Sequence, residues 1–340
     1  MTDLLLSMIH TLVAAFTGGV LLAGDFAYGQ QDRAPLRFEK EIPLAGVEGR
    51  IDHCSVDVPG KRIFIAALGN GTVEVVDLVK GERTTEIRGL KEPQGLYYDD
   101  ATSRLYVASA GDGTLRVYDG KGLTLQSKLE FGDDADNVRY DVKTRQIWVG
   151  YGSGGLGVVA ATEKAGEIPL GSHPESFQLE HTGSRVFVNV PKEFGVVVVD
   201  RAKHAVISKW GLDRTFANYP MALDEGDGRL FVGCRLPARL VILDTNSGQV
   251  VAKLPIVGDT DDVFFDPTRQ LIYVIGGDGA VDIFRMHDPN HFDHVGRTNT
   301  AAGARTGLFV PGLDRLFVAV PHRGSQMAKL LVYEVKQSAQ

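Results

Sequence analysis

A short apolar string recurs along the chain at an almost constant interval. Its first residue is usually basic or polar, and an aliphatic residue, an aromatic residue and usually valine follow. The string starts at Arg62, Arg104, Gln146, Arg185, Arg229, Leu271 and Arg315, with spacings of 42, 42, 39, 44, 42 and 44 residues. Short runs of β-branched and aromatic residues between turn residues predict strands, so we expect one β unit repeated seven times.

Each unit extends this pattern on both sides of the string. In six units an acidic residue precedes the string by about five positions: Asp57, Asp99, Asp141, Glu180, Asp224 and Asp266. We interpret Asp57, Asp99, Asp141 and Asp266 as caps of tight turns, because aspartate oxygens accept bonds from nearby backbone N–H groups. A second apolar run such as Thr72 to Asp77 follows the string, and then a more polar one such as Gln249 to Ile256. Four short strands per unit, with no convincing helical period, predict a propeller blade.

The last unit lacks its fourth strand, and the start of the chain supplies a candidate. Residues Glu41 to Leu44 have the same sequence as Glu167 to Leu170, a predicted fourth strand in the third unit. We therefore expect the segment from about Leu36 to Ala45 to form the outer strand of the last blade, which would leave no incomplete blade. The predicted fold is an all-β, seven-bladed β-propeller of four antiparallel strands per blade, spanning residues 36–336.

The repeated strings resemble those of a known group of bacterial propellers. Together with Gly69-Asn70-Gly71-Thr72-Val73 and Asp112-Gly113-Thr114-Leu115, they are similar to the YVTN-repeat, YncE-like family. The resemblance implies the propeller fold over about residues 36 to 336. It leaves function open, because such propellers include binding proteins, scaffolds and enzymes.

Composition and charge narrow the classes of partner. The chain has 36 basic and 43 acidic side chains, a formal charge of −7, which argues against binding to nucleic acid. Its two cysteines, Cys54 and Cys234, exclude a disulfide framework and fall in predicted strands as small buried residues. The sequence contains no motif for haem attachment, nucleotide binding or a quinone cofactor. The 40 glycines fit a chain with many tight turns.

The first 29 residues are predicted to be a separate segment. Leu4 to Ala23 is nearly all apolar, and Ala27-Tyr28-Gly29 fits the small-x-small pattern of signal-peptide cleavage. The run lacks the basic start expected of a signal peptide, and its length of about twenty residues also fits an uncleaved anchor. A mis-chosen start codon or a cytosolic protein is the third alternative. We expect export to the periplasm or the medium, with membrane contact only through an uncleaved N-terminus.

Alignment of the seven units with one another separates residues that build the blade from residues that can form a site. Five positions before the strand-ending residue the units differ: Asp52, Gln94, Asp136, Glu175, Tyr219, Asp261 and Arg305. The next position holds His53, Gly95, Asn137, Ser176, Pro220, Asp262 and Thr306. The first strand of each blade lines the channel, so these side chains are expected to converge around one funnel. Loops between second and third strands open on the same face and would add Arg235 and His322.

Three outcomes remain open for this funnel: a hydrated channel with arginine–carboxylate pairs, a divalent-cation site, or a metal-free site for a small polar molecule. The expected cation ligands are Asp136, Glu175 and Asp261. Oxygen ligands suit Ca²⁺, Mg²⁺ or Mn²⁺, and an added imidazole allows Zn²⁺. With a metal present, His53 or His173 would serve as general acid or base. The residues expected to contact a polar ligand are Asp52, Asn137, Tyr219, Arg235, Asp262, Arg305 and His322.

These alternatives give three function hypotheses. The first is an exported propeller that binds a small polar ligand or a divalent cation at the mouth of its channel. The second is a metal-dependent hydrolase, lactonase or lyase that uses the same acidic funnel. The third is a protein-interaction scaffold, for which Phe216 and Tyr219 are the candidate aromatic surface in a predicted long loop from Asp213 to Pro220.

Overall fold

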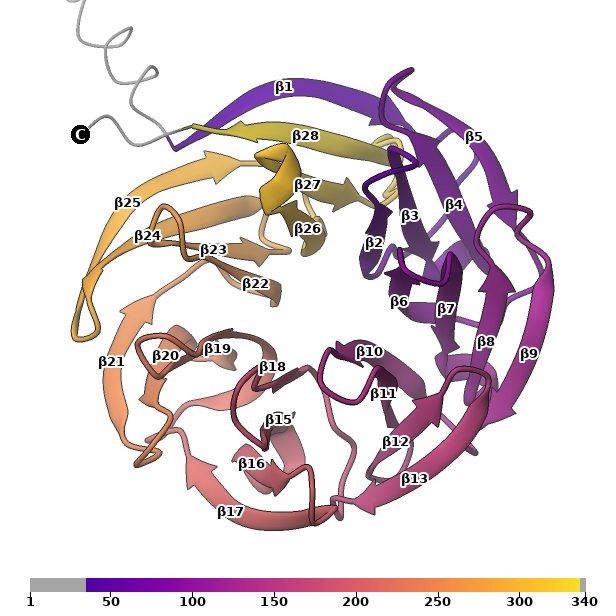
Figure 1. Ribbon diagram of the computed structural model, residues 1–340. Helices are drawn as coiled ribbons and strands as arrows, with labels where there is room; N and C mark the ends of the chain where they lie inside the picture. Colours follow the sequence, from indigo (N-terminus) through magenta and orange to yellow (C-terminus); the bar gives the residue numbers. More distant parts are fainter. Residues whose placement is uncertain (1–34, 337–340) are drawn as a thin grey trace, which may run out of the picture. The chain divides into compact units, whose positions relative to one another are not determined.

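The seven predicted units form seven four-stranded antiparallel sheets arranged around a common centre (Figure 1). The computed structural model describes residues 35–336. In six blades the strands follow chain order from the centre outward. The predicted signal peptide or anchor, residues 1–29, lies outside the described residues. Within residues 35–336 no helix has the length and apolar character needed to span a membrane.

The strand bounds follow the repeat. The first and second blades contain β2 (Cys54–Asp57), β3 (Arg62–Ala67), β4 (Thr72–Asp77), β5 (Glu82–Ile87), β6 (Pro93–Asp99), β7 (Arg104–Ser109), β8 (Thr114–Asp119) and β9 (Leu125–Glu130). The third and fourth contain β10 (Ala135–Asp141), β11 (Gln146–Tyr151), β12 (Gly155–Ala160), β13 (Glu163–Pro169), β14 (Phe177–Leu179), β15 (Arg185–Val190), β16 (Gly195–Asp200) and β17 (Ala205–Gly211).

The remaining blades continue the same order. The fifth and sixth contain β18 (Phe216–Asp224), β19 (Arg229–Leu236), β20 (Ala238–Asp244), β21 (Val250–Pro255), β22 (Thr260–Asp266), β23 (Leu271–Gly276), β24 (Ala280–Asp288) and β25 (His291–Asn299). The last contains β26 (Thr306–Val310), β27 (Arg315–Val320), β28 (Lys329–Val335) and β1 (Leu36–Pro43). Within residues 35–336, four 3-10 turns lie between strands: η1 (Leu68–Asn70), η2 (Ala110–Asp112), η3 (Pro191–Glu193) and η4 (Pro311–Leu313).

The N-terminal strand closes the ring, as predicted. β1 pairs antiparallel with β28 from Leu36 opposite Val335 to Pro43 opposite Lys329, and it forms the outer edge of the last blade. Ile42 and Leu44 are fully buried in a cluster that joins the first and last blades. Closure therefore depends on apolar contacts made by the N-terminal strand as well as on its backbone hydrogen bonds.

Substituting Ile42 by alanine should destabilise the closed ring. Ile42 has no exposed surface, and truncation of a buried isoleucine costs about 2–5 kcal/mol. Phe38, in the same strand, is 53% exposed, so Phe38→Ala is expected to cost at most about 1 kcal/mol. Urea unfolding followed by tryptophan fluorescence measures both. Equal urea midpoints of unfolding for the two variants would contradict the role of Ile42 in holding the first and last blades together.

Asp57, Asp99, Asp141 and Asp266 cap turns, as predicted from the sequence. Asp57 accepts a bond from the backbone N–H of Gly60 at 2.7 Å, and it also pairs with the Arg62 guanidinium. Asp141 and Asp266 accept bonds from the backbone N–H groups of Lys143 and Thr268. The acid and the first residue of the string thus belong to the blade framework and leave the channel to other side chains.

Irregular pairing at the start of the innermost strands shapes the funnel. The register shifts between Pro93 and Leu96 in β6, Ala135 and Val138 in β10, Asn218 and Met221 in β18, and Thr260 and Asp262 in β22. Such bulges change the direction of side chains relative to a regular strand. In β10 the bulge lets the adjacent residues Asp136 and Asn137 both line the same cavity.

The predicted loop from Asp213 to Pro220 is wrong in its second half. Residues from Phe216 onward belong to β18, and the ladder with β19 extends to the pair Phe216 and Leu236. The ladder satisfies the backbone groups that a loop would leave to solvent. The predicted aromatic pair is also separated: Phe216 packs edge-on against Phe194, whereas Tyr219 lines the funnel.

Candidate metal centre

The funnel is a polar cavity of about 430 Å³ at one end of the channel. It brings together all the predicted site residues except Asp262 and His322. Those that line it are Asp52, His53, Asp136, Asn137, His173, Glu175, Tyr219, Arg235, Asp261 and Arg305. Gln94 of the second blade also lines the cavity, so residues from all seven blades meet at one place, as the internal alignment of the repeats predicts.

The two exceptions lie close by but face elsewhere. Asp262 follows Asp261 in β22 and lines a second cavity, where its Oδ2 accepts a bond from the Gly307 N–H at 2.8 Å. His322 lies in the turn after β27, and its Nδ1 is 2.6 Å from Glu48 Oε2. We therefore do not include either residue among those lining the funnel.

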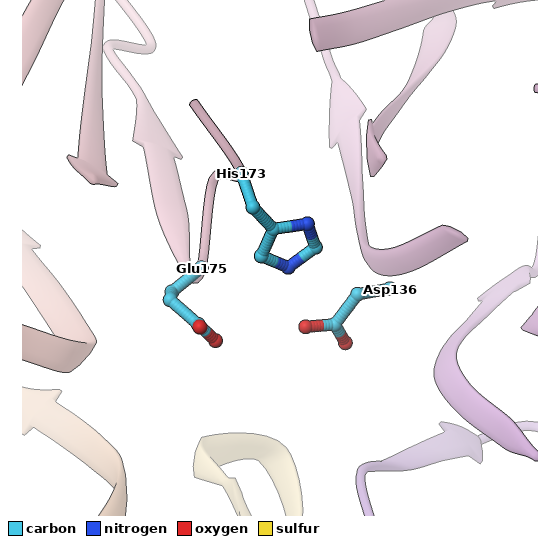
Figure 2. Close-up of side chains that lie close together, drawn as sticks. All are labelled: Asp136, His173 and Glu175. Carbon is cyan, nitrogen blue, oxygen red and sulfur yellow. The ribbon is translucent and has the colours of Figure 1, made fainter. Parts of the chain in front are cut away.

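Three ligand-type side chains converge on one side of the funnel. One oxygen each from Asp136 and Glu175 and one ring nitrogen of His173 all lie within 4.8 Å of one another. Figure 2 shows the carboxylates and the imidazole directed toward a common point. This set differs in one member from the predicted cation ligands, because His173 occupies the place expected for Asp261.

The ring of His173 is oriented by a backbone group. Its Nδ1 lies 3.0 Å from the carbonyl oxygen of Gly152. A carbonyl only accepts hydrogen bonds, so Nδ1 carries a proton, and in the neutral ring Nε2 is the nitrogen that can bind a metal. A histidine that binds a metal through one ring nitrogen typically donates a hydrogen bond from its other ring nitrogen to such a carbonyl group. Gly152 has φ +49°, and a side chain there would approach Asp133 closely, so this turn favours glycine.

Two polar oxygens near this point are buried and lack hydrogen-bond partners. Among the residues that the structure describes, Asp136 Oδ1 and Asn137 Oδ1 accept no hydrogen bond. Asp136 is 6% exposed and Asn137 is 3% exposed. Leaving a buried carboxylate oxygen unpaired is costly, and a bound cation would remove that cost.

The carboxyl groups in the funnel hold their protons more tightly than usual. Burial, reinforced by the neighbouring charges of Asp136 and Asp261, raises the pKa of Glu175 to about 8. Burial also raises the pKa of Asp136, although the nearby His53 partly opposes the shift. Without a cation the funnel therefore keeps some of its acids neutral.

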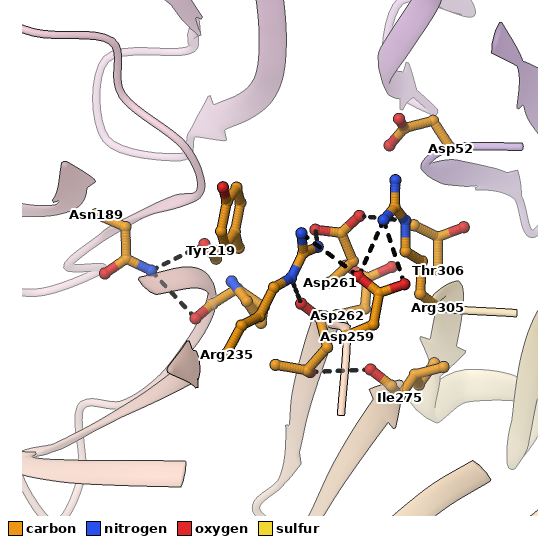
Figure 3. A network of polar contacts seen from close by, with 12 residues as sticks. Asp52, Asn189, Tyr219, Arg235, Asp259, Asp261, Asp262, Ile275, Arg305 and Thr306 are labelled. Carbon is orange, nitrogen blue, oxygen red and sulfur yellow. Dashed lines mark hydrogen bonds and ion pairs between the residues drawn. The ribbon is translucent and has the colours of Figure 1, made fainter. Parts of the chain in front are cut away.

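The opposite wall is a network of two arginines and two aspartates (Figure 3). Arg235 Nη2 lies 2.7 Å from Asp261 Oδ1, and Arg305 Nε lies 3.0 Å from Asp261 Oδ2. Asp259 contacts both guanidinium groups, at 3.5 Å from Arg235 and 3.0 Å from Arg305. The Arg235 guanidinium also lies 3.9 Å from the centre of the Tyr219 ring. Asp261 is thus occupied by ion pairs on the side away from the triad.

His53 lies at the bottom of the funnel between two carboxylates. Its Nε2 is 3.5 Å from Asp52 Oδ1, and its Nδ1 is 3.5 Å from Asp262 Oδ1. Burial opposes its charge, but Asp262 and Asp52 outweigh burial and raise the pKa of His53 to about 10. His53 therefore carries a positive charge at neutral pH and does not offer a lone pair to a metal.

Sequence reasoning missed several charged residues of the funnel rim. Arg50, Glu92 and Asp134 line the cavity, and Asp259 belongs to the arginine network. Each stands two positions before one of the aligned positions Asp52, Gln94, Asp136 and Asp261, as does His173 before Glu175. Glu92, Asp134 and Asp259 all have positive φ, near 50°. The same internal alignment, extended back by two positions, would have found them.

Comparison with protein-family models and with curated protein sequences found no match. Among solved structures, the hydrazine synthase of Kuenenia stuttgartiensis is similar, with a TM-score of 0.71 and 16% identity over 82% of this chain and 95% of that chain. A chain from the mitotic checkpoint complex gives a TM-score of 0.74 at 13% identity, over 96% of this chain and 99% of that one. The chain is a seven-bladed β-propeller. At these identities the likeness shows the fold alone.

Proposed function

We propose that this propeller binds one divalent cation in the funnel through Asp136, His173 and Glu175. The observation that carries the proposal is the convergence of their three ligand atoms within 4.8 Å, with Asp136 Oδ1 buried and unpaired beside them. One imidazole and two carboxylates favour Zn²⁺ or Mn²⁺ over Ca²⁺, which prefers six to eight oxygens. The bound ion would offset the mutual repulsion of the acids.

The same cavity has space for a small polar ligand beside the ion. Its volume of about 430 Å³ is within the range of small-molecule sites, and its walls offer Asp52, Asn137 and Arg235 as polar contacts. We further propose that the protein is exported, on the apolar run from Leu4 to Ala23, and that it is related to the YVTN-repeat propellers, on its repeated strings.

A second candidate function is metal-dependent hydrolysis or elimination. Three protein ligands leave at least one position of the ion open to water or substrate, as in catalytic zinc sites. His53, whose pKa is raised to about 10, would be available as a general acid. A panel of lactones and esters assayed with and without Zn²⁺ tests this function; turnover that does not depend on the ion would count against it.

Calorimetric titration of chelator-treated protein with Mn²⁺ and with Zn²⁺ tests cation binding. We expect one ion per chain and a higher melting temperature in its presence. The double variant Asp136→Asn/Glu175→Gln is expected to weaken binding by more than about 100-fold, because loss of an outer-shell partner alone costs about 10–100-fold. Glu92→Gln is the matched control, since Glu92 lines the same funnel outside the triad. Equal losses in both variants, or no binding by the wild type, would refute the proposal.

A further inference from the structure

The channel contains a second cavity beyond the funnel, with different chemistry. It measures about 440 Å³ and shares His53 and Ser176 with the funnel. Its other walls come from residues further along the same innermost strands. They are mostly apolar and aromatic, among them Leu96, Tyr97, Met221, Leu223, Phe264 and Leu308. We call this cavity the lower chamber.

Arg139 lines the lower chamber with its charge unpaired. The only hydrogen bond of its side chain within the described residues runs from Nη1 to the carbonyl oxygen of Val138, at 2.9 Å. No carboxylate oxygen of residues 35–336 lies within 4.0 Å of its guanidinium, which rests over the Phe177 ring at 5.8 Å. Burial lowers the pKa of Arg139, with Asp262 and Asp136 opposing the shift from a distance. Arg235 and Arg305 in the funnel, by contrast, each pair with two carboxylates.

The other charged groups that face the lower chamber satisfy one another. Asp262 accepts the Gly307 N–H at Oδ2, and its Oδ1 lies 3.5 Å from His53 Nδ1. Asp262 is therefore engaged near the boundary with the funnel and does not neutralise Arg139. What remains is a guanidinium with unused N–H donors inside a largely apolar cavity. Such a group gains most from an anion that accepts two parallel hydrogen bonds.

We propose that the lower chamber binds an anionic molecule with an apolar body, such as an aromatic or aliphatic monocarboxylate. The carboxylate would accept two hydrogen bonds from Arg139. The body of the molecule would pack against Tyr97, Phe264 and Leu308 on the chamber wall. This site is separate from the cation site in the funnel and does not depend on it.

Benzoate and octanoate are suitable probes, with benzyl alcohol as the neutral counterpart of benzoate. The titrations use metal-free protein, so that a carboxylate bound to an ion in the funnel does not contribute. We expect saturable binding of at least one of the two carboxylates, and a loss of about 10–100-fold in Arg139→Gln, the range for a hydrogen bond to a charged group. The affinity for benzyl alcohol should be weak, and it should be equal in the wild type and in Arg139→Gln. Arg88→Gln, at an exposed arginine outside the channel, is the matched charge control.

Two further variants keep the test decisive. Arg139→Lys retains the positive charge but loses the two parallel N–H donors of the guanidinium, so its affinity for carboxylates should fall. Because the charge is kept, this variant should fold even if Arg139→Gln does not. Glu175→Gln, in the funnel, should leave carboxylate affinity unchanged. The proposal is overturned if neither carboxylate saturates below about 10 mM, or if Arg139→Lys binds both as well as the wild type does. It is also overturned if Glu175→Gln loses carboxylate affinity, which would place the probe in the funnel.

Discussion

Lowering the pH from 8 to 6 is expected to weaken cation binding by about 50-fold, because Glu175 must release its proton before it can bind the ion. The pKa of Glu175 is raised to about 8. Half of this carboxyl is therefore ionised at pH 8, and about one hundredth at pH 6. The proton and the cation compete for the same oxygen, so the apparent affinity falls as the pH falls.

Calorimetric titrations with Mn²⁺ at several pH values between 6 and 8 measure this dependence. In Glu175→Gln the binding is expected to be weaker but much less dependent on pH, because the titrating carboxyl is gone. Wild-type affinity that stays constant over this range would show that Glu175 does not ligate the ion.

The stability of the cation-free protein is expected to fall as the pH rises, whereas the affinity for the cation rises. A carboxyl whose pKa is raised by folding stabilises the protein below its unfolded pKa, and this contribution is lost as the pH rises through the folded pKa. Glu175, Asp136 and Asp261 all have raised pKa values. His53, whose pKa is also raised, adds a contribution of the same sign. Melting temperatures should therefore fall from pH 5 to 8 without the ion, and added Mn²⁺ should restore most stability at pH 8.

The sequence predicts the fold well because its seven repeated units can be aligned with one another. A single blade is a weak pattern of short strands, but seven copies at nearly equal spacing fix the strand order. The match of Glu41–Leu44 to Glu167–Leu170 was sufficient to predict that β1 closes the last blade. The same alignment predicts that Asp136 and Glu175, 39 residues apart, converge in one funnel, and the structure places their ligand atoms within 4.8 Å of each other.

The roles of the funnel residues could not be read from the same pattern. Asp261 and Asp136 occupy equivalent positions in their blades, yet Asp261 pairs with Arg235 and Arg305 whereas Asp136 has no such partner. That difference depends on where long arginine side chains from neighbouring blades reach. Arg139 was missed for another reason: only the packed channel shows that no carboxylate of residues 35–336 reaches it.

Asp261→Asn is expected to leave the cation site intact and to destabilise the protein by less than about 3 kcal/mol, because the burial that raises the pKa of Asp261 offsets part of what its ion pairs contribute. Asp261 is 15% exposed and contacts both Arg235 and Arg305, so its loss leaves two partly buried guanidinium groups to share Asp259. Breaking a buried ion pair from one side costs about 3–5 kcal/mol. Asp213→Asn is the matched control, because Asp213 is 61% exposed in its pair with Lys253 and should cost at most about 1 kcal/mol.

The effect of Asp261→Asn on cation binding separates the two possible ligand sets. If Asp136, His173 and Glu175 hold the ion, the affinity should fall far less than it does in Asp136→Asn, because the charge of Asp261 is already paired with Arg235 and Arg305. If Asp261 is itself a ligand, as the sequence alone suggested, its loss should weaken binding as much as the loss of Asp136 does. Denaturant unfolding without the ion and calorimetry with it measure the two effects independently. A stable variant that fails to bind Mn²⁺ would thus assign Asp261 to the metal, and a destabilised variant that binds normally would assign it to the arginine network.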